Sequence, residues 1–233
     1  MIVIYSFIII MILTILLIFG IISYYSKKDY ENSEYRKATG KTYNEVLHNK
    51  GTRGEYHLYN SLRPFLNTGA KILTNLYLPY KNETSEVDIV LIHRSGIFVF
   101  ECKNYKGWIF GSQDNYKWTQ TFKSGKKYTF YNPIMQNDKH IKCIKNSLQC
   151  KYIPIYSIIV FSDECTLKKL NVTRSDVVVT KELQVCNSIQ KFMHDNVLDD
   201  YDIKIAYERL AKYCNASDDV KIRHINTINR KYK

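Results

Sequence analysis

Several common signatures of enzymes and secreted proteins are missing from this 233-residue sequence. Its six cysteines are too few for a disulfide scaffold and include no Cys-x-x-Cys pair, which disfavours zinc ribbons and thioredoxin-like sites. Isolated thiols of this kind fit a reducing compartment better than an oxidising one. The sequence also has no P-loop, no Gly-x-Ser-x-Gly and no His-Glu-x-x-His motif, so it carries no signature of those three enzyme classes.

Glycine and proline are scarce as well, with 9 and 4 residues, and the chain has no internal repeat or low-complexity tract. Hydrophobic residues make up 45% of the chain and charged residues 24%, a balance typical of folded proteins. The length suits one domain, or one domain with an appendage. The net charge of +12 is compatible with nucleic acid or anionic lipid as a partner, but lysine spread along the whole chain is more typical of a solvated surface.

Charge is absent from the first 26 residues, and residues 2–22 form an almost unbroken apolar run. About 20 apolar residues suffice for a helix to cross the hydrocarbon core of a bilayer. A cleaved signal sequence is disfavoured, because the run is too long, no basic region precedes it and no small-x-small cleavage site follows it. We therefore expect residues 1–25 to form a retained transmembrane anchor that contacts the lipid bilayer through residues 2–25.

Basic residues follow the apolar run but do not precede it, and the nearest are Lys27, Lys28, Arg36, Lys37 and Lys41. Positive charge beside transmembrane helices concentrates on the cytoplasmic side of the membrane. The asymmetry therefore predicts a single-pass membrane protein whose C-terminal domain is cytoplasmic. The free cysteines agree with this orientation.

The rest of the chain alternates helical and strand patterns. Residues 26–50 have mixed charge and few apolar residues, and we interpret them as a juxtamembrane linker with a short helix. Helical patterns then cover residues 51–65, 133–150, 181–193 and 201–213. Strand patterns cover residues 71–78, 87–93, 97–103, 107–112, 116–121, 127–130, 155–161 and 177–180.

This order of elements predicts an α/β (α+β) fold in which helices flank a mixed sheet. Pro79 is expected to end the first strand, residues 80–85 to form a polar turn, and Asn132 to cap the helix that follows it. We assign residues 51–150 to a core and residues 151–233 to strands and helices that complete or extend it. The closing basic segment, residues 221–233, is expected to be a solvated tail.

Two carboxylates lie beside strongly apolar strand patterns, where an unpaired charge is costly. Asp88 precedes the apolar residues 89–92, and Glu101 follows the apolar residues 97–100. Side chains alternate between the two faces of a strand, so Glu101 shares a face with Lys103. If the two strands pair antiparallel across the turn between them, Asp88 lies near Glu101. The sequence thus predicts two acids and an ammonium group at one edge of the sheet.

Such a group of side chains suits the hydrolysis of phosphodiesters. Two carboxylates can hold Mg²⁺ (or Mn²⁺), which keeps water ligands, accepts phosphate oxygens and can supply a hydroxide-like nucleophile. A lysine ammonium can orient the attacking water or stabilise negative charge on the phosphate. A Glu-x-Lys pair at the end of a strand is by itself more often a surface ion pair, so the hypothesis needs a wider pattern.

Five blocks that occur in order along the chain supply that pattern. They are Gly51-x-x-Gly54-Glu55, Glu86-Val87-Asp88, the segment Phe-Glu-Cys-Lys-Asn-Tyr-Lys-Gly at 100–107, Trp118, and Asn132-Pro133-Ile134-x-Gln136. With these blocks, residues 51–150 resemble the NERD family, the nuclease-related domain, which is itself similar to the PD-(D/E)xK nuclease superfamily with its restriction-endonuclease-like fold. NERD proteins are often fused to membrane helices, which fits the apolar run. The proline of the superfamily motif is replaced by Val87.

The resemblance implies roles for five residues. Asp88 and Glu101 would be metal ligands, and Lys103 would be the catalytic lysine. Glu55 would act through a water molecule, and Gln136 would contact the scissile backbone or a metal-bound water. The last two have structural alternatives, since Glu55 fits a capping box at the start of its helix and Gln136 fits an ordinary polar residue of a first helical turn.

Aromatic and basic residues are interleaved between positions 105 and 131, a pattern found in proteins that stack bases and contact phosphates. The candidates for nucleic-acid binding are Lys106, Trp108, Lys117 and Trp118. The alternative, which we favour slightly, is a tyrosine-rich hairpin that packs on the sheet. Three histidines are isolated in sequence and are interpreted as structural or exposed residues: His57, His93 and His140.

Together these patterns predict a membrane-anchored nuclease that depends on Mg²⁺ or Mn²⁺ and hydrolyses DNA phosphodiester bonds. DNA is favoured over RNA as the nucleic-acid partner. The alternative is a non-catalytic module on the same fold, tethered to the membrane, that binds nucleic acid or protein without turnover. The presence of both acids and the lysine favours catalysis.

Overall fold

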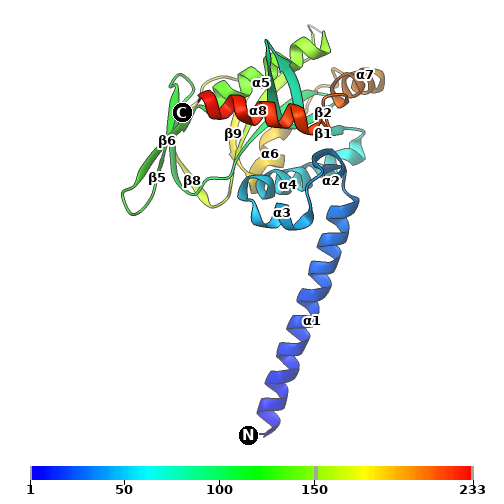
Figure 1. Cartoon of the computed structure of the whole chain (residues 1–233), viewed down its shortest axis with the longest axis vertical. Coiled ribbons are helices and arrows are strands. Elements are labelled where there is room, and N and C mark those ends of the chain that lie inside the picture. The colour runs from blue at the N-terminus through cyan, green and yellow to red at the C-terminus, as the bar shows by residue number, and fades with distance from the viewer. Residues whose placement is uncertain (1, 150–151, 232–233) are drawn as a thin grey trace.

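Two β-sheets make up the centre of the protein, and a long N-terminal helix projects from it (Figure 1). The computed structural model describes residues 2–149 and 152–231. The larger sheet has the strand order β1-β2-β3-β7-β9, and the smaller sheet has the order β6-β5-β4-β8. The strands are β1 (Lys71–Tyr80), β2 (Glu83–His93), β3 (Gly96–Lys103), β4 (Gly107–Ser112), β5 (Lys117–Thr121), β6 (Lys127–Tyr131), β7 (Ile155–Phe161), β8 (Cys165–Asn171) and β9 (Val177–Lys181).

Helices surround these sheets, so the predicted α/β class is confirmed. The α-helices are α1 (Ile2–Asn32), α2 (Glu34–Thr39), α3 (Tyr43–His48), α4 (Lys50–Leu62), α5 (Pro133–Leu148), α6 (Val185–Gln190), α7 (Asp200–Ala211) and α8 (Asp218–Lys231). Two 3₁₀-helices, η1 (Arg63–Thr68) and η2 (Glu182–Gln184), follow α4 and precede α6. Both sheets are mixed, because each contains parallel and antiparallel pairs.

The antiparallel hairpin of β2 and β3 is the centre of the larger sheet. Its register pairs Ile89 with Phe100 and His93 with Gly96. Gly96 has a φ angle of 138°, and a Cβ at this position would lie 2.6 Å from the carbonyl oxygen of Pro154, so the turn requires glycine. β3 then pairs in parallel with β7, and β7 pairs in parallel with β9.

Helices cover both faces of the larger sheet. On one face, α4, α6 and the N-terminal helices bury a cluster that contains Ile89 and Phe100. On the other face, α5 and α7 bury a cluster that contains Val90 and Val99. Since successive side chains of a strand point to opposite faces, β2 and β3 supply apolar side chains to both layers. Their near-continuous hydrophobic sequences follow from this double burial.

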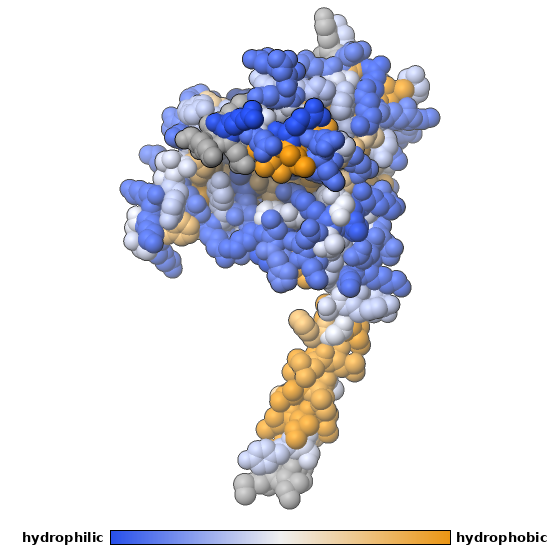
Figure 2. Space-filling model, viewed as in Figure 1, coloured by the Kyte–Doolittle hydropathy of each residue, from blue (hydrophilic) through white to orange (hydrophobic). Residues whose placement is uncertain are grey.

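Helix α1 contains the apolar N-terminal run and continues beyond it. Its 31 residues have a length of ~47 Å at 1.5 Å per residue. The described side chains of its apolar part are exposed and form the orange shaft in Figure 2. Within the described residues, α1 is the helix that is long and apolar enough to cross a membrane. Near its C-terminal end, Tyr30 is fully buried in the core on the α4 side of the sheet.

Residues 26–50 differ from the predicted linker with a short helix. They form the end of α1 and two further helices, α2 and α3, whose N-termini are capped by the side chains of Ser33 and Thr42. Three of their side chains belong to the same core as α4: Tyr30, Tyr35 and Val46. These buried residues are so widely spaced that they produce no helical periodicity, and the sequence pattern therefore did not reveal them.

The smaller sheet is built around Trp118. Its indole ring is fully buried, stacks on Phe161 with a centroid distance of 6.1 Å, and covers Gly111, where a Cβ would come within 2.1 Å of the ring. Strand β8, which pairs in parallel with β4, was not predicted. Its two adjacent lysines, Lys168 and Lys169, and a register shift in its pairing with β4 interrupt the alternation that marks a strand.

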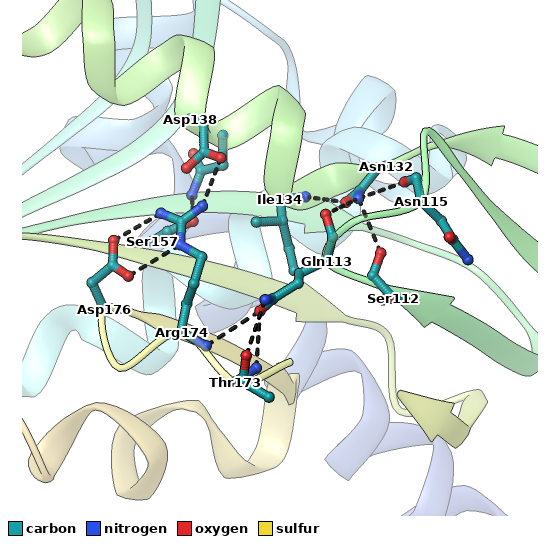
Figure 3. Close-up of polar contacts among 11 residues, drawn as sticks. Ser112, Gln113, Asn115, Asn132, Ile134, Asp138, Ser157, Thr173, Arg174 and Asp176 are labelled. Carbon is teal, nitrogen blue, oxygen red and sulfur yellow. Dashed lines mark hydrogen bonds and ion pairs between the residues drawn. The ribbon is translucent and has the colours of Figure 1, made fainter. Parts of the chain in front are cut away.

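Helix α5 begins after Asn132, as predicted, and a polar network holds it in place (Figure 3). Asn132 Oδ1 accepts from the N–H of Ile134 at 2.9 Å. Its side-chain NH₂ donates to the carbonyl oxygens of Ser112, Gln113 and Asn115. One turn further along α5, Asp138 accepts from Arg174, whose guanidinium also binds Asp176 just before β9. These contacts fix α5 to both sheets.

The hairpin of β1 and β2 is longer than predicted. β1 does not end before Pro79 but continues to Tyr80, and Pro79 pairs with Thr84 of β2. Proline is tolerated here because β1 is an edge strand, where one side of the backbone makes no sheet hydrogen bonds. The polar turn predicted for residues 80–85 shortens to residues 81–82.

The C-terminal region is more ordered than predicted. The segment 221–233, expected to be a solvated tail, belongs largely to helix α8, in which His224 is buried against β2, and residues 232–233 lie outside the described part of the chain. The helix predicted for residues 181–193 is divided into the end of β9, η2 and the short α6. Helix α5 ends at Leu148, and Cys150, where its end was predicted, is also outside the described residues.

Residues 26–50 should be required for stability. Deletion of residues 1–50 removes three buried side chains, each worth about 1.5–3 kcal/mol of burial, a sum comparable to the 5–15 kcal/mol stability of a typical domain. We expect a chain that begins at residue 26 to unfold cooperatively and a chain that begins at residue 51 to lack a cooperative transition in near-ultraviolet circular dichroism. Equal melting temperatures for the two truncated chains would contradict this role.

Acid should destabilise the fold in part through His93 in the β2–β3 hairpin. Its Nδ1 accepts from the N–H of Ser95 at 3.2 Å, and burial together with Arg94 lowers the pKa of His93. The unfolded chain therefore binds more protons below about pH 6.5, so stability falls as the pH drops through this range. We expect His93→Asn, which can keep the acceptor without titrating, to melt with a weaker dependence on pH between 7.5 and 5.5.

The control for this prediction is His48→Asn, since His48 is exposed at the end of α3. The melting temperatures of the wild type, His93→Asn and His48→Asn are all measured on the full chain in detergent. An unchanged pH dependence in His93→Asn would show that this histidine is not one of the groups responsible.

Candidate active site

The strand register brings Asp88 and Glu101 together. Ile89 pairs with Phe100, and Asp88 and Glu101 are the residues next to this pair on β2 and β3. Burial and the charge of Glu101 both raise the pKa of Asp88, so the two carboxyl groups lie within electrostatic range of each other. The Asp88 carboxylate accepts a hydrogen bond at 2.8 Å from the backbone N–H of Cys102, which fixes it at the end of β3. The juxtaposition predicted from the sequence is therefore present.

Asp88 lies where both β1 and β2 change the face that they bury. In a regular strand, side chains on one face are two residues apart. In the core on the α5 side, two pairs of side chains are instead three residues apart: Leu73 and Leu76 on β1, and Val87 and Val90 on β2. Between the two β1 residues, Asn75 has a φ angle of 57°, and the regular pairing skips Asn75 and Asp88. Asparagine tolerates this left-handed conformation better than most residues. The irregularity re-aims the Asp88 side chain, as strand irregularities near functional sites often do.

Glu101 is nearly inaccessible, with 2% of its surface exposed, and both of its oxygens have partners. Lys103 Nζ lies 2.7 Å from Glu101 Oε1, and His140 Nε2 lies 3.0 Å from Glu101 Oε2. The same ammonium of Lys103 donates to Gln136 Oε1 at 3.0 Å. Gln136 and His140 both come from α5, so the docking of this helix completes the surroundings of the carboxylate. Lys103 and Gln136 thus lie together with Glu101, as the sequence predicted.

His140 is a site residue that sequence reasoning missed. Because a carboxylate only accepts hydrogen bonds, His140 Nε2 must carry a proton and donate to Glu101. The other ring nitrogen, Nδ1, is 2.8 Å from the hydroxyl of Ser85 on β2. The available signal was the spacing of four residues between Gln136 and His140, which places both on one face of a helix. Ser85 carried no comparable signal.

Charge at the site is predominantly negative. Burial raises the pKa of Asp88, and repulsion from Glu101 and Glu55 adds to the shift. Burial also favours the neutral form of Glu101, but Lys103 and His140 outweigh it and lower the pKa of this carboxyl. The Lys103 ammonium is disfavoured by burial, yet the adjacent Glu101 carboxylate raises its pKa overall. The site thus combines three carboxyl groups with one adjacent ammonium, Lys103, whose charge Glu101 already neutralises, and with Lys41 beside Glu55.

Glu55 lies close enough to interact with this group but has partners of its own. Burial raises its pKa, opposed by Lys41 at 3.9 Å and by the Tyr35 hydroxyl, which donates to Glu55 Oε2 at 3.0 Å. The capping-box alternative for Glu55 is wrong, because α4 begins one turn earlier with Asn49 as its N-cap. Two of the groups that hold Glu55 therefore come from the segment between α1 and α4.

The donor set fits a hard divalent cation. In the described part of the chain, no three His, Cys, Asp or Glu side chains converge as a preformed metal cage. Mg²⁺ does not require such a cage, since it commonly binds to one or two carboxylates and keeps its remaining ligands as water and phosphate oxygens. Asp88 and Glu101 provide the two carboxylates, and the excess of negative charge around them would be relieved by a cation.

A cavity gives access to this group. It has a volume of ≈ 370 Å³ and is lined by Asp88, Gln136 and His140, among other residues. Its walls come from β2, α5 and α8, together with Tyr131 at the end of β6. Asp88 therefore faces a space that can admit part of a substrate, whereas the buried Glu101 lies behind the lining residues His140 and Gln136.

None of the four residues considered for nucleic-acid binding lines this cavity: Trp108, Lys117 and Trp118 lie on the smaller sheet, and Lys106 lies just before it. Trp118 cannot stack on a base, because it is fully buried and its indole N–H donates to the carbonyl oxygen of Ser112. Trp108 is partly exposed and lies under the ammonium of Lys168. Lys106 forms an ion pair with Glu164, and Lys117 is exposed. The alternative of an aromatic hairpin that packs on the sheet describes Trp118 correctly.

Comparison with known proteins agrees with the resemblance that the sequence blocks carry. The family model of the nuclease-related domain matches residues 50–162. The chain is also 30% identical over 187 residues to an uncharacterized protein of Bacillus anthracis, across 78% of this chain and 85% of that protein. The chain belongs to the NERD family. The region of this NERD protein that the model matches includes α4, β2, β3 and α5, which carry all five predicted site residues.

The hydrogen bond from His140 should stabilise this NERD domain. His140→Ala leaves one oxygen of a buried carboxylate without a donor, which typically costs about 2–3 kcal/mol. For a chain of this size the expected fall in melting temperature is about 5–10 °C. The matched control, His48→Ala on the surface of α3, should change stability by less than about 0.5 kcal/mol. A melting temperature for His140→Ala equal to that of the control would refute this prediction.

Proposed function

We propose that this NERD protein is a membrane-anchored, metal-dependent nuclease that hydrolyses DNA phosphodiester bonds. The observation that supports the proposal is the grouping of Asp88, Glu101 and Lys103 at one end of the β2–β3 hairpin. The site has more carboxyl groups than positive groups to pair with them, and such an arrangement lowers the stability of the fold. When it lies beside a lysine and a cavity, it is typical of a functional site. Membership of the nuclease-related family supports phosphodiester hydrolysis as the reaction.

In this proposal Asp88 and Glu101 hold Mg²⁺ or Mn²⁺. When bound, the metal supplies a site for phosphate oxygens and an activated water molecule. Lys103 remains protonated, is positioned by Glu101 and Gln136, and can donate to negative charge that develops on the phosphate. Glu55, whose charge adds to the effect of burial in raising the pKa of Asp88, acts through a water molecule. His140 keeps Glu101 ionised and fixed in orientation through its own contact with Ser85.

The cellular setting is part of the same proposal. The exposed apolar surface of α1 supports a single transmembrane anchor in the lipid bilayer. The basic residues that follow it support a cytoplasmic position for the domain. The first test uses fluorescently labelled double-stranded DNA as the substrate.

The test measures cleavage of labelled DNA by the full chain in detergent, with Mg²⁺ or with EDTA. We expect cleavage to require the metal, and we expect Asp88→Asn and Lys103→Gln each to reduce the rate at least 100-fold, because each removes a group that acts on the transition state. Asp114→Asn in the loop between β4 and β5 and Lys71→Gln at the start of β1 make the same changes of charge at exposed positions and should stay within about threefold of the wild type.

Loss of activity in Asp88→Asn should not reflect unfolding. The amide can still accept from the Cys102 N–H while the repulsion with Glu101 and Glu55 disappears, so its melting temperature should equal or exceed that of the wild type. Cleavage that survives both Asp88→Asn and Lys103→Gln would reject the assignment. Salt-dependent DNA binding without any metal-dependent cleavage would instead favour the non-catalytic tether.

A further inference from the structure

Two cavities join on the side of the sheet where Asp88 lies. One, of ≈ 370 Å³, is the space beside Asp88, Gln136 and His140. The other, of ≈ 440 Å³, extends along α8. The two cavities share four lining residues, Glu83, Thr84, His224 and Thr227. They therefore adjoin, and together they line the surface from the candidate active site along the C-terminal helix; we call this surface the groove.

The orientation of α8 is unusual for a surface helix, whose apolar face normally packs on the protein. Ile222 and Ile225 each expose 55% of their surface, and Figure 2 shows an apolar patch over α8. The side of the helix that lines the groove is mostly polar: beside Val220 it carries Arg223, His224, Asn226, Thr227 and Arg230. In this orientation Ile222 and Ile225 remain exposed, and the guanidinium groups of Arg223 and Arg230 line the groove.

His224 holds α8 in this orientation. Its Nδ1 lies 3.0 Å from Thr84 Oγ1, and its Nε2 lies 3.5 Å from Glu86. Its ring also packs edge-on against Tyr77, with a centroid distance of 5.5 Å. All three partners belong to the hairpin of β1 and β2. Because polar contacts to this hairpin set the rotation of the helix, the basic side of α8 stays directed at the groove.

We propose that the groove-lining side of α8 binds the phosphodiester backbone of the nucleic-acid strand that enters the candidate active site. This proposal rests on the proposed function. Arginine suits the role because its planar guanidinium can make two hydrogen bonds to one phosphate. Arg223 is also oriented by a hydrogen bond from its Nε to the carbonyl oxygen of Asp219.

The spacing of the two arginines fits a nucleic-acid backbone. Seven residues separate Arg223 from Arg230, which is about 10 Å along the helix axis. A strand of a DNA duplex advances about 3.4 Å along its axis for each phosphate, so this distance corresponds to about three nucleotides. Helix α8 also lies on the side of the domain away from the free end of α1 (Figure 1). Nucleic acid can therefore reach it without meeting the surface from which α1 leaves the domain.

The test compares two double variants of the full chain in detergent. Arg223→Ala/Arg230→Ala removes two charges from α8, and Lys123→Ala/Lys126→Ala removes two exposed charges from the turn between β5 and β6. Binding of a labelled DNA oligonucleotide is measured by fluorescence anisotropy in EDTA at several salt concentrations. We expect the α8 variant to bind at least tenfold more weakly and the slope of log K against log salt to fall by about 2, whereas the turn variant stays close to wild type.

The outcomes separate this proposal from the proposed function. Wild-type affinity in the α8 variant, or equal weakening in both double variants, would overturn the role of α8. Binding that depends on α8 without cleavage in Mg²⁺ would keep that role and reject the nuclease activity. If the alanine variant does not fold, Arg223→Gln/Arg230→Gln replaces it, and a version of the oligonucleotide in RNA shows whether α8 distinguishes the two sugars.

Discussion

The buried carboxylate of Glu101 is the constraint on which the centre of the molecule depends. A charge at this depth is tolerated only when both oxygens have donors, and the two donors come from different elements. Lys103 lies on the same strand, but His140 lies on α5 and is held in turn by Ser85 on β2. The formation of the hairpin and the docking of α5 are therefore coupled through one chain of hydrogen bonds.

The second acid, Asp88, shows how the same region departs from an ideal sheet. It lies where two strands shift their buried face, opposite Asn75 in a left-handed conformation. It also lies close enough to Glu55 and Glu101 for their charges to raise its pKa. Natural folds retain irregular backbone and like charges of this kind where function requires them and compensate elsewhere. Here the compensation comes from two apolar layers that enclose β2 and β3 on both faces.

The sequence revealed those parts of the site that local patterns encode. Alternation along two apolar strands and a glycine turn were sufficient to place Asp88, Glu101 and Lys103 together, since pairing across a hairpin is local. The role of His140 depends on how α5 docks, which is a long-range contact that a single sequence does not show. The helical packing of residues 26–50 and the orientation of α8 were missed for the same reason. Each depends on a few buried residues, such as Tyr30 and His224, within otherwise polar segments.

The continuity of α1 with the core has a mechanical consequence. Tyr30 is buried within the domain while the helix that carries it is unbroken from residue 2 to residue 32, and Asp29 pairs with Arg63 at the end of α4. Because α1 enters the domain as one unbroken helix, a change in the tilt of α1 rotates the whole domain. Under the proposal that α1 spans a membrane, a bilayer of different thickness would change the tilt of α1 and so turn the groove toward or away from the membrane surface.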